Sequence, residues 1–225
     1  LYESAARLCS FSPKDYWEQF SPKGKLEADG TLFHSAQDCW SWDLSLTLSE
    51  ASIHYRGVEA NRIFLALEFT PKAAEIRKFE WCIRDTLFRI ETDREIPIKL
   101  PLELPRTTLS FKNFYIDRSL YLPFPMGEKV WNFIKAEGFV DAKIVMEGNP
   151  LKNLPSAEVF CYKMKAQFAE VPYPSEVLSA HLSFHDRCLD LKEIRAKSAV
   201  CDAPIYVSGK VWPLDRTKKE VPLDV

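Results

Sequence analysis

The stretch from Trp40 to Tyr55 alternates apolar and polar residues along its length. Its apolar members up to position 48 are Trp40, Trp42, Leu44, Leu46 and Leu48, and the polar residues between and after them are Ser41, Asp43, Ser45, Thr47 and Ser49. Because successive side chains of a strand point to opposite faces, this pattern predicts a strand with one face in the core. We expect its polar face to meet solvent or a partner, and burial of Ser45 and Thr47 in the core would contradict this register.

A turn over 57–61 and a second, more apolar strand over 63–69 follow, so a sheet is expected to begin here. After it, the segment from Pro71 to Ile90 has helical spacing. Its apolar residues recur at steps of three and four, namely Ile76, Phe79, Ile83, Leu87 and Ile90. This spacing predicts a long helix over about 71–90 that covers the sheet.

A second, shorter helix is predicted over about 128–137, ended by Gly138. Short helices are also expected in an N-terminal segment over 1–25. The other segments read as strands, and the one over 96–105 is expected at a sheet edge because Pro97, Pro101 and Pro105 remove donors from one side. The predicted fold is therefore a single α+β domain over 1–225, dominated by antiparallel sheet and built as a sandwich or an open barrel.

Composition narrows the classes of function. The chain has 225 residues, 46% of them hydrophobic, and 30 basic residues nearly balance 32 acidic ones. A wide basic surface for nucleic acid is therefore not expected. Only 7 glycines disfavour glycine-rich phosphate loops. The 6 widely spaced cysteines are interpreted as buried free thiols, and no apolar run reaches membrane-spanning length, so a cytoplasmic protein without a membrane segment is predicted.

The strongest candidates for metal ligands are His181, His185, Cys188 and Cys201, which offer nitrogen and sulfur donors as zinc requires. Their spacing is irregular, and the two histidines also alternate with apolar residues as in a plain amphipathic strand. No metal site and no cofactor is therefore predicted. A metal-dependent hydrolase or nuclease stays as an alternative, through the acid-x-lysine pairs Asp141 to Lys143 and Asp190 to Lys192.

A second alternative is a single-stranded nucleic-acid-binding protein, because aromatic and basic residues interleave in the middle of the chain. Its candidate residues are Lys112, Tyr115, Arg118 and Tyr121. Bases stack on rings and amines meet phosphates in such sites. Core packing explains the rings equally well, and nearby acidic residues dilute the charge.

Protein interaction is the favoured function, since no Gly-x-Ser-x-Gly elbow or other catalytic signature is found. On the predicted helix, Trp81 and Phe88 would lie opposite the apolar stripe, rimmed by Arg77 and Arg84, as in an interface hot spot. The polar strand face of Ser41, Asp43, Ser45 and Thr47 is a second candidate surface. We therefore predict a non-enzymatic interaction or assembly protein, of accessory or viral type, that binds a protein partner or itself.

Overall fold

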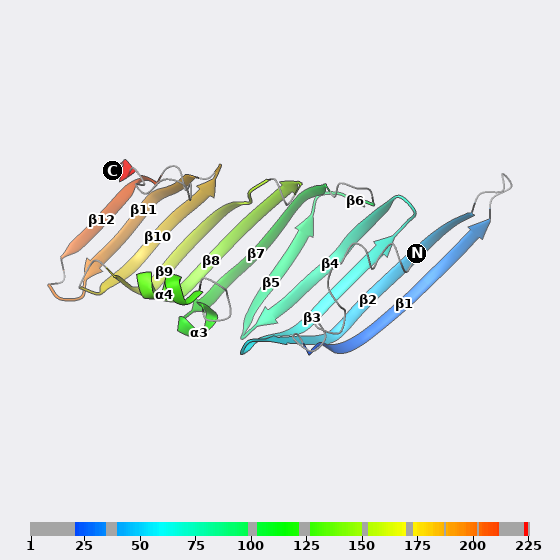
Figure 1. Cartoon of the computed structure of the whole chain (residues 1–225), viewed down its shortest axis with the longest axis horizontal. Coiled ribbons are helices and arrows are strands. Elements are labelled where there is room, and N and C mark those ends of the chain that lie inside the picture. Colours follow the sequence, from blue (N-terminus) through cyan, green and yellow to red (C-terminus); the bar gives the residue numbers. More distant parts are fainter. Residues whose placement is uncertain are drawn as a thin grey trace.

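The computed structural model describes residues 21–34, 40–98, 103–121, 127–149, 153–169, 173–186, 188–201, 203–211 and 223–224. These residues form one antiparallel sheet whose strands lie side by side in nearly the order of the sequence (Figure 1). The order is β1-β2-β3-β4-β5-β7-β8-β9-β10-β11-β12-β13, and β6 pairs with β4 off this path. No pairing joins β1 to β13 within the described ranges, so the sheet is one open layer.

The strands in the first half of the sheet are β1 (Lys23–His34), β2 (Trp40–Tyr55), β3 (Val58–Phe69), β4 (Ala73–Ile83), β5 (Thr86–Thr92) and β6 (Ile96–Pro97). Those in the second half are β7 (Leu104–Ile116), β8 (Ile134–Gly148), β9 (Ser156–Phe168), β10 (Ser175–His185), β11 (Cys188–Ser198), β12 (Pro204–Val211) and β13 (Leu223–Asp224). The described helices are α3 (Arg118–Tyr121) and α4 (Gly127–Phe133), at the ends of β7 and β8 (Figure 1).

The prediction of antiparallel strands is confirmed, whereas the predicted α+β fold is wrong. The segment 71–90 is the hairpin β4–β5 and not a long helix. The single open layer is neither a sandwich nor a barrel among the described residues. The short helix predicted over 128–137 is present as α4 but ends at Phe133, where β8 begins.

Two local irregularities explain the false helical spacing. A β-bulge between Ile76 and Lys78 shifts the register of β4 against β3, so Ile76 and Phe79 share a face although they are three positions apart. A two-residue turn then joins Ile83 to its partner Thr86, with Arg84 at a φ of 56°. The bulge and the turn thus produce steps of three and four in the predicted stripe, although its member Leu87 lies on the opposite face from Ile83 and Ile90.

The edges of the predicted elements also need correction. Residues 1–20 of the predicted N-terminal helical segment lie outside the described residues, and Lys23 onward belongs to β1. The expected edge strand over 96–105 is instead a two-residue β6 and the start of β7, a strand inside the sheet. Pro105 is accommodated there because the register of β7 against β8 shifts between Leu104 and Thr107.

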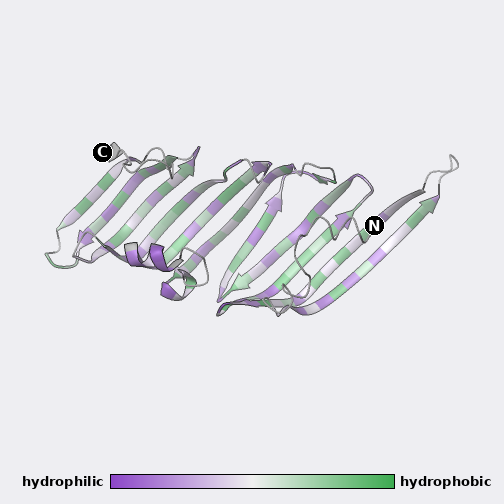
Figure 2. Cartoon of the chain, in the orientation of Figure 1, coloured by the Kyte–Doolittle hydropathy of each residue, from purple (hydrophilic) through white to green (hydrophobic). Residues whose placement is uncertain are grey.

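The two faces of the sheet differ in polarity, and cross-strand partners show which residues share a face. Along most strands, hydrophobic and hydrophilic residues alternate, as Figure 2 shows. We call the face that carries Leu46 and Leu67 the apolar face, and the face that carries Ser45 and Glu68 the polar face. Ser45 is exposed and Thr47 half-buried, so the register predicted for this strand is confirmed.

One glycine allows two strands of the second half to approach closely. A Cβ added to Gly138, at a φ of +150°, would lie 2.6 Å from the Cα of Met164. We therefore expect Gly138→Ala to lower the free energy of unfolding by about 2 kcal/mol, the usual cost of overpacking. Gly30→Ala is the matched control, because the nearest atoms to its added Cβ lie 3.4 Å away. Urea unfolding of both variants measures the difference, and equal stabilities would contradict the close approach.

Candidate functional site

The apolar face carries an unbroken row of hydrophobic residues across the sheet. Each member is the direct cross-strand partner of the next, from β1 to β11. The row is Leu26, Leu48, Leu65, Phe79, Ile90, Leu109, Ile144, Ala157, Phe184 and Leu189. We call it the apolar row. None of its members is buried, and Leu26 is 68% exposed.

The chain exposes far more surface than a folded domain of its mass. Its accessible surface is 16425 Å² at 26.0 kDa. The scaling of surface with mass gives about 10,500 Å² for a globular monomer of this size. No large side chain among the described residues is fully buried. Among the described residues, the apolar face therefore lacks the second layer that normally covers a sheet.

One packed part of this face is an aromatic cluster on β4, β5 and β7. Phe88 is 6% exposed, and its ring centroid lies 5.5 Å from that of Trp81, 4.6 Å from Phe111 and 5.0 Å from Phe114. Beside it is an apolar hollow of about 310 Å³, which Leu120 of α3 also lines. This hollow is a ready-made pocket for an apolar side chain.

The predicted interface residues do not form one surface. Trp81 and Phe88 stack on the apolar face, on the same side as Ile76, and not opposite it. Arg77 lies with Glu68 on the polar face, with its Nη2 atom 2.7 Å from Glu68 Oε2. Arg84, at the β4–β5 turn, donates to the carbonyl of Tyr115 and to Asp117. The arginines therefore do not rim the aromatic pair as a helix would have placed them.

The second predicted surface holds together better. Ser41, Asp43, Ser45 and Thr47 all lie on β2, and their partners on β1 are Phe33, Thr31, Asp29 and Glu27. Ser41, Asp43 and Ser45 are exposed. They form a polar strip on the polar face, near the β1 edge of the sheet.

Sequence reasoning missed a polar cluster around Glu158, whose members come from β9, β10 and β11. His181 Nε2 lies 2.5 Å from Glu158 Oε2, Ser183 Oγ donates to Oε1 at 2.8 Å, and Lys192 Nζ lies 3.0 Å from Oε1. Burial raises the pKa of Glu158, but hydrogen bonds from His181, Lys192 and Ser183 outweigh it and hold the pKa at about 2. The signal in the sequence was the alternation of His181 and Ser183, but it could not identify their partner on another strand.

This cluster predicts an acid-sensitive contribution to stability. A carboxyl group with a folded-state pKa of about 2, below its ordinary value of 4.5, stabilises the fold above pH 4.5 and loses this effect as the pH falls toward 2. We expect wild type to be more stable than Glu158→Gln at pH 7, and the difference to shrink between pH 4.5 and 2. Urea unfolding at several pH values measures it. A difference in stability that stays constant with pH would contradict the lowered pKa of Glu158.

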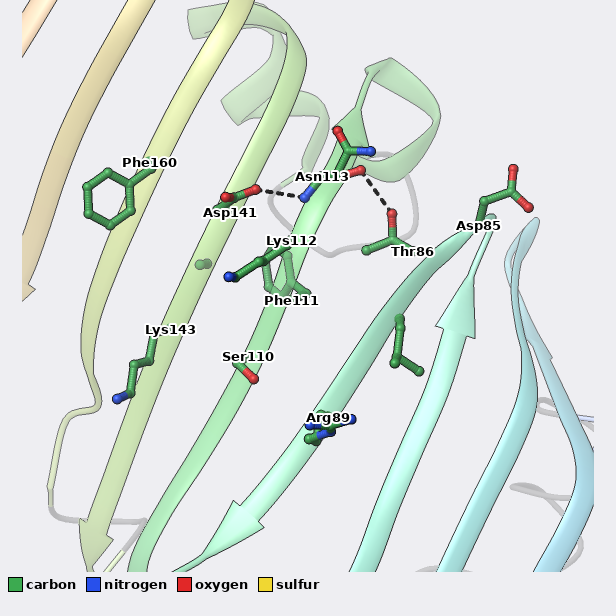
Figure 3. Close-up of a pocket in the computed structure, with 12 residues that line it drawn as sticks. Asp85, Thr86, Arg89, Ser110, Phe111, Lys112, Asn113, Asp141, Lys143 and Phe160 are labelled. Atoms are coloured by element: carbon green, nitrogen blue, oxygen red, sulfur yellow. Dashed lines mark hydrogen bonds between the residues drawn. The ribbon is translucent and has the colours of Figure 1, made fainter.

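A hollow of about 690 Å³ lies on the same face as Glu158, and Figure 3 shows the residues that line it. Lys112, a predicted nucleic-acid residue, lines it. Tyr115 does not line it: this ring is 39% exposed and packs edge-on against Phe139 at 5.2 Å. Arg118 and Tyr121 lie on α3, where Tyr121 contacts the ring of Trp131. The structure thus separates Lys112 from α3, and brings it near Lys143 instead.

The candidate metal ligands are not gathered together. His181 contacts Glu158, His185 is the cross-strand partner of buried Cys188, and Cys201 is exposed beyond β11. No group of three or more His, Cys, Asp or Glu side chains able to hold a metal occurs among the residues described.

The acid-x-lysine pairs have other contacts. Asp141 Oδ1 accepts the amide proton of Asn113 at 2.7 Å and the hydroxyl of Tyr162 at 3.0 Å. Asp190 is the cross-strand partner of Ser183 and Lys210, whereas Lys192 reaches Glu158. Neither pair is joined by a further carboxylate in a metal-binding group of the described residues.

Comparison with protein-family models, with curated proteins and with solved structures found no match to this chain. Neither of the helices that the structure describes is long and apolar enough to span a bilayer.

Proposed function

We propose that this protein is a non-enzymatic assembly subunit whose apolar face packs against the apolar face of a second copy. The observation that carries the proposal is the apolar row, which crosses the sheet without a covering layer in the described structure. Two sheets that interdigitate their inner faces lie about 10 Å apart. A second copy would therefore supply the missing layer and turn two open sheets into one sandwich.

The amount of uncovered surface favours a permanent partner. The chain exposes 16425 Å², which exceeds the expectation for a globular monomer by roughly 6,000 Å². A standard transient interface buries only about 800 Å² per partner, whereas obligate homodimers bury several thousand in total. The part of this excess that lies on the apolar face, with the exposed side chains of Leu26, Leu32 and Trp42, is available to such an interface.

The composition of the row favours a copy of the same chain. The apolar row contains no charged residue, so two identical rows meet without like-charge repulsion. A two-fold axis through the middle of the sheet brings the same patch of both copies together, which is how most homodimers form. The aromatic cluster and the adjoining hollow lined by Leu120 would give this interface an anchor.

The test is the mass of the wild-type protein in solution, measured with light scattering over a range of concentrations. We expect twice the chain mass of 26.0 kDa. In the same samples, side-chain footprinting should show that Trp42 and Leu65 of the apolar face are protected from modification. Thr31 and Asp43 of the polar face should be modified. A monomer at every concentration with a freely modified apolar face would contradict the proposal. A monomer whose apolar face is covered by co-purified lipid would equally contradict it.

A further inference from the structure

The polar face has a hollow that the proposed assembly leaves open. It lies over β5, β7 and β8 and extends to Phe160 on β9 (Figure 3). Arg89, Ser110 and Lys143 are successive cross-strand partners on this face. Lys112, two positions after Ser110 on β7, also lines the hollow. We call this hollow the polar basin.

Three cations surround one hydroxyl group in the polar basin. Neighbouring strands lie about 4.8 Å apart, so Arg89 and Lys143 flank Ser110 from either side at roughly 5 Å between backbones. Lys112 follows along the same strand. Like charges gathered in this way repel one another, so an anion bound over Ser110 would relieve the repulsion.

No described residue neutralises the two lysines. Arg89 is paired with two carboxylates, since its Nε atom lies 2.8 Å from Glu80 Oε1 and its Nη1 atom 3.7 Å from Glu91 Oε1. Lys112 and Lys143 are exposed, and neither forms an ion pair or hydrogen bond with a described residue. Glu158, opposite Lys143, already accepts hydrogen bonds from His181, Ser183 and Lys192. The positive charge of both lysines is therefore available to a ligand.

The two carboxylates of the basin lie away from Arg89. Asp141 is beside Asn113 and Asp85 is at the β4–β5 turn (Figure 3). Because Asp141 Oδ1 already accepts from the Asn113 amide and the Tyr162 hydroxyl, part of its charge is compensated. The end of the basin around Ser110 is therefore its anion-binding end.

An aromatic ring completes the basin. Phe160 stacks with His181 at 4.1 Å and an interplanar angle of 20°, yet it remains 46% exposed. One side of this ring is therefore open to a second planar group. Exposed rings on a sheet, next to cations that meet phosphates, bind nucleobases in many single-strand readers.

We propose that the polar basin binds a nucleotide, either free or as part of a single strand. Its phosphate lies over Ser110 between Arg89, Lys112 and Lys143, and its base stacks on Phe160. The site is on the polar face, so it is independent of the proposed packing of apolar faces, and its failure would leave that proposal untouched.

The test is calorimetric titration of the full chain at low salt with AMP, ribose 5-phosphate and a short oligoadenylate. We expect Lys112→Gln combined with Lys143→Gln to weaken AMP binding about tenfold or more. Lys165→Gln is the matched control, because Lys165 is an exposed β9 residue that does not line the basin, and it should leave binding unchanged. Phe160→Ala should weaken AMP at least fivefold but leave ribose 5-phosphate unchanged, since only AMP carries a base.

The arms of the titration separate the sources of the nucleotide. Oligoadenylate that binds tighter than AMP, with an affinity that falls steeply with salt, identifies a single strand as the ligand. Equal or weaker binding of the oligomer identifies a free nucleotide. The proposal is overturned if wild type binds neither AMP nor oligoadenylate. It is also overturned if the double lysine variant binds as tightly as Lys165→Gln.

Discussion

Leu109→Asp is expected to convert the protein from a dimer into separate chains. Leu109 is the β7 member of the apolar row, between Ile90 and Ile144 near the middle of the sheet. A carboxylate placed there would be desolvated in a sandwich without a cationic partner, at a cost of several kcal/mol per ion. The symmetry of the dimer doubles the effect, so dimerisation should weaken by on the order of 100-fold or more.

Thr108→Asp is the matched control for this substitution. Thr108 precedes Leu109 on the same strand, and its partners Glu91 and Val145 lie on the polar face. The same charge is therefore added to the opposite face, and the dimer should persist. Light scattering and far-ultraviolet circular dichroism of both variants show mass and fold together. Equal masses for the two variants would contradict the proposed interface.

Unfolding of Leu109→Asp would also be informative, because obligate dimers often have no stable monomer. In that case the wild-type melting temperature must rise with protein concentration, as mass action requires. A wild-type melting temperature that is independent of concentration, together with an unfolded variant, would show that Leu109 packs only within its own chain. The proposal of an interface between apolar faces would then be wrong.

The sequence was sufficient to predict the sheet where the alternation was uninterrupted. β2 is observed over Trp40–Tyr55 with the predicted alternation, but the apolar side that was expected in the core is not buried between Trp42 and Leu48, and Trp42 is exposed. Between Ile76 and Ile90 the same signal was present in Phe79, Trp81 and Ile83, which alternate on one face. A bulge before them replaced a step of two by a step of three, and after the turn Leu87 of the polar face continued the apparent stripe, so the hairpin has the apolar spacing of a helix.

The polar-face sites could not have been predicted, because they depend on the register between strands. Lys143 and Ser110 are partners although they are far apart in the sequence, and Glu158 meets His181 through a different pair of strands. A single sequence shows which residues share a strand face, but not which residue lies opposite. For the same reason Lys112 was grouped with Tyr115, Arg118 and Tyr121 as a nucleic-acid-binding residue, whereas in the structure it lines one hollow with Lys143.

Phe88→Ala is expected to lower the free energy of unfolding by about 3 kcal/mol, the usual cost of truncating a buried phenylalanine. Phe88 is 6% exposed and contacts the rings of Trp81, Phe111 and Phe114, so its loss removes the centre of the aromatic cluster. These contacts lie within one layer of one chain. The loss of stability should therefore not depend on protein concentration.

Leu87→Ala is the matched control, since Leu87 is the preceding residue on β5 but is 46% exposed and lies on the polar face opposite Cys82. Its cost should stay within about 0.5 kcal/mol, as for most surface substitutions. Trp81→Ala and the double variant complete a cycle in which the stacked pair should couple by about 1 kcal/mol. Urea unfolding at one low protein concentration compares the four variants with wild type. If Phe88→Ala were no less stable than Leu87→Ala, the aromatic cluster would not be packed in the monomer. The apolar face would then depend on the second copy even for its best-buried ring.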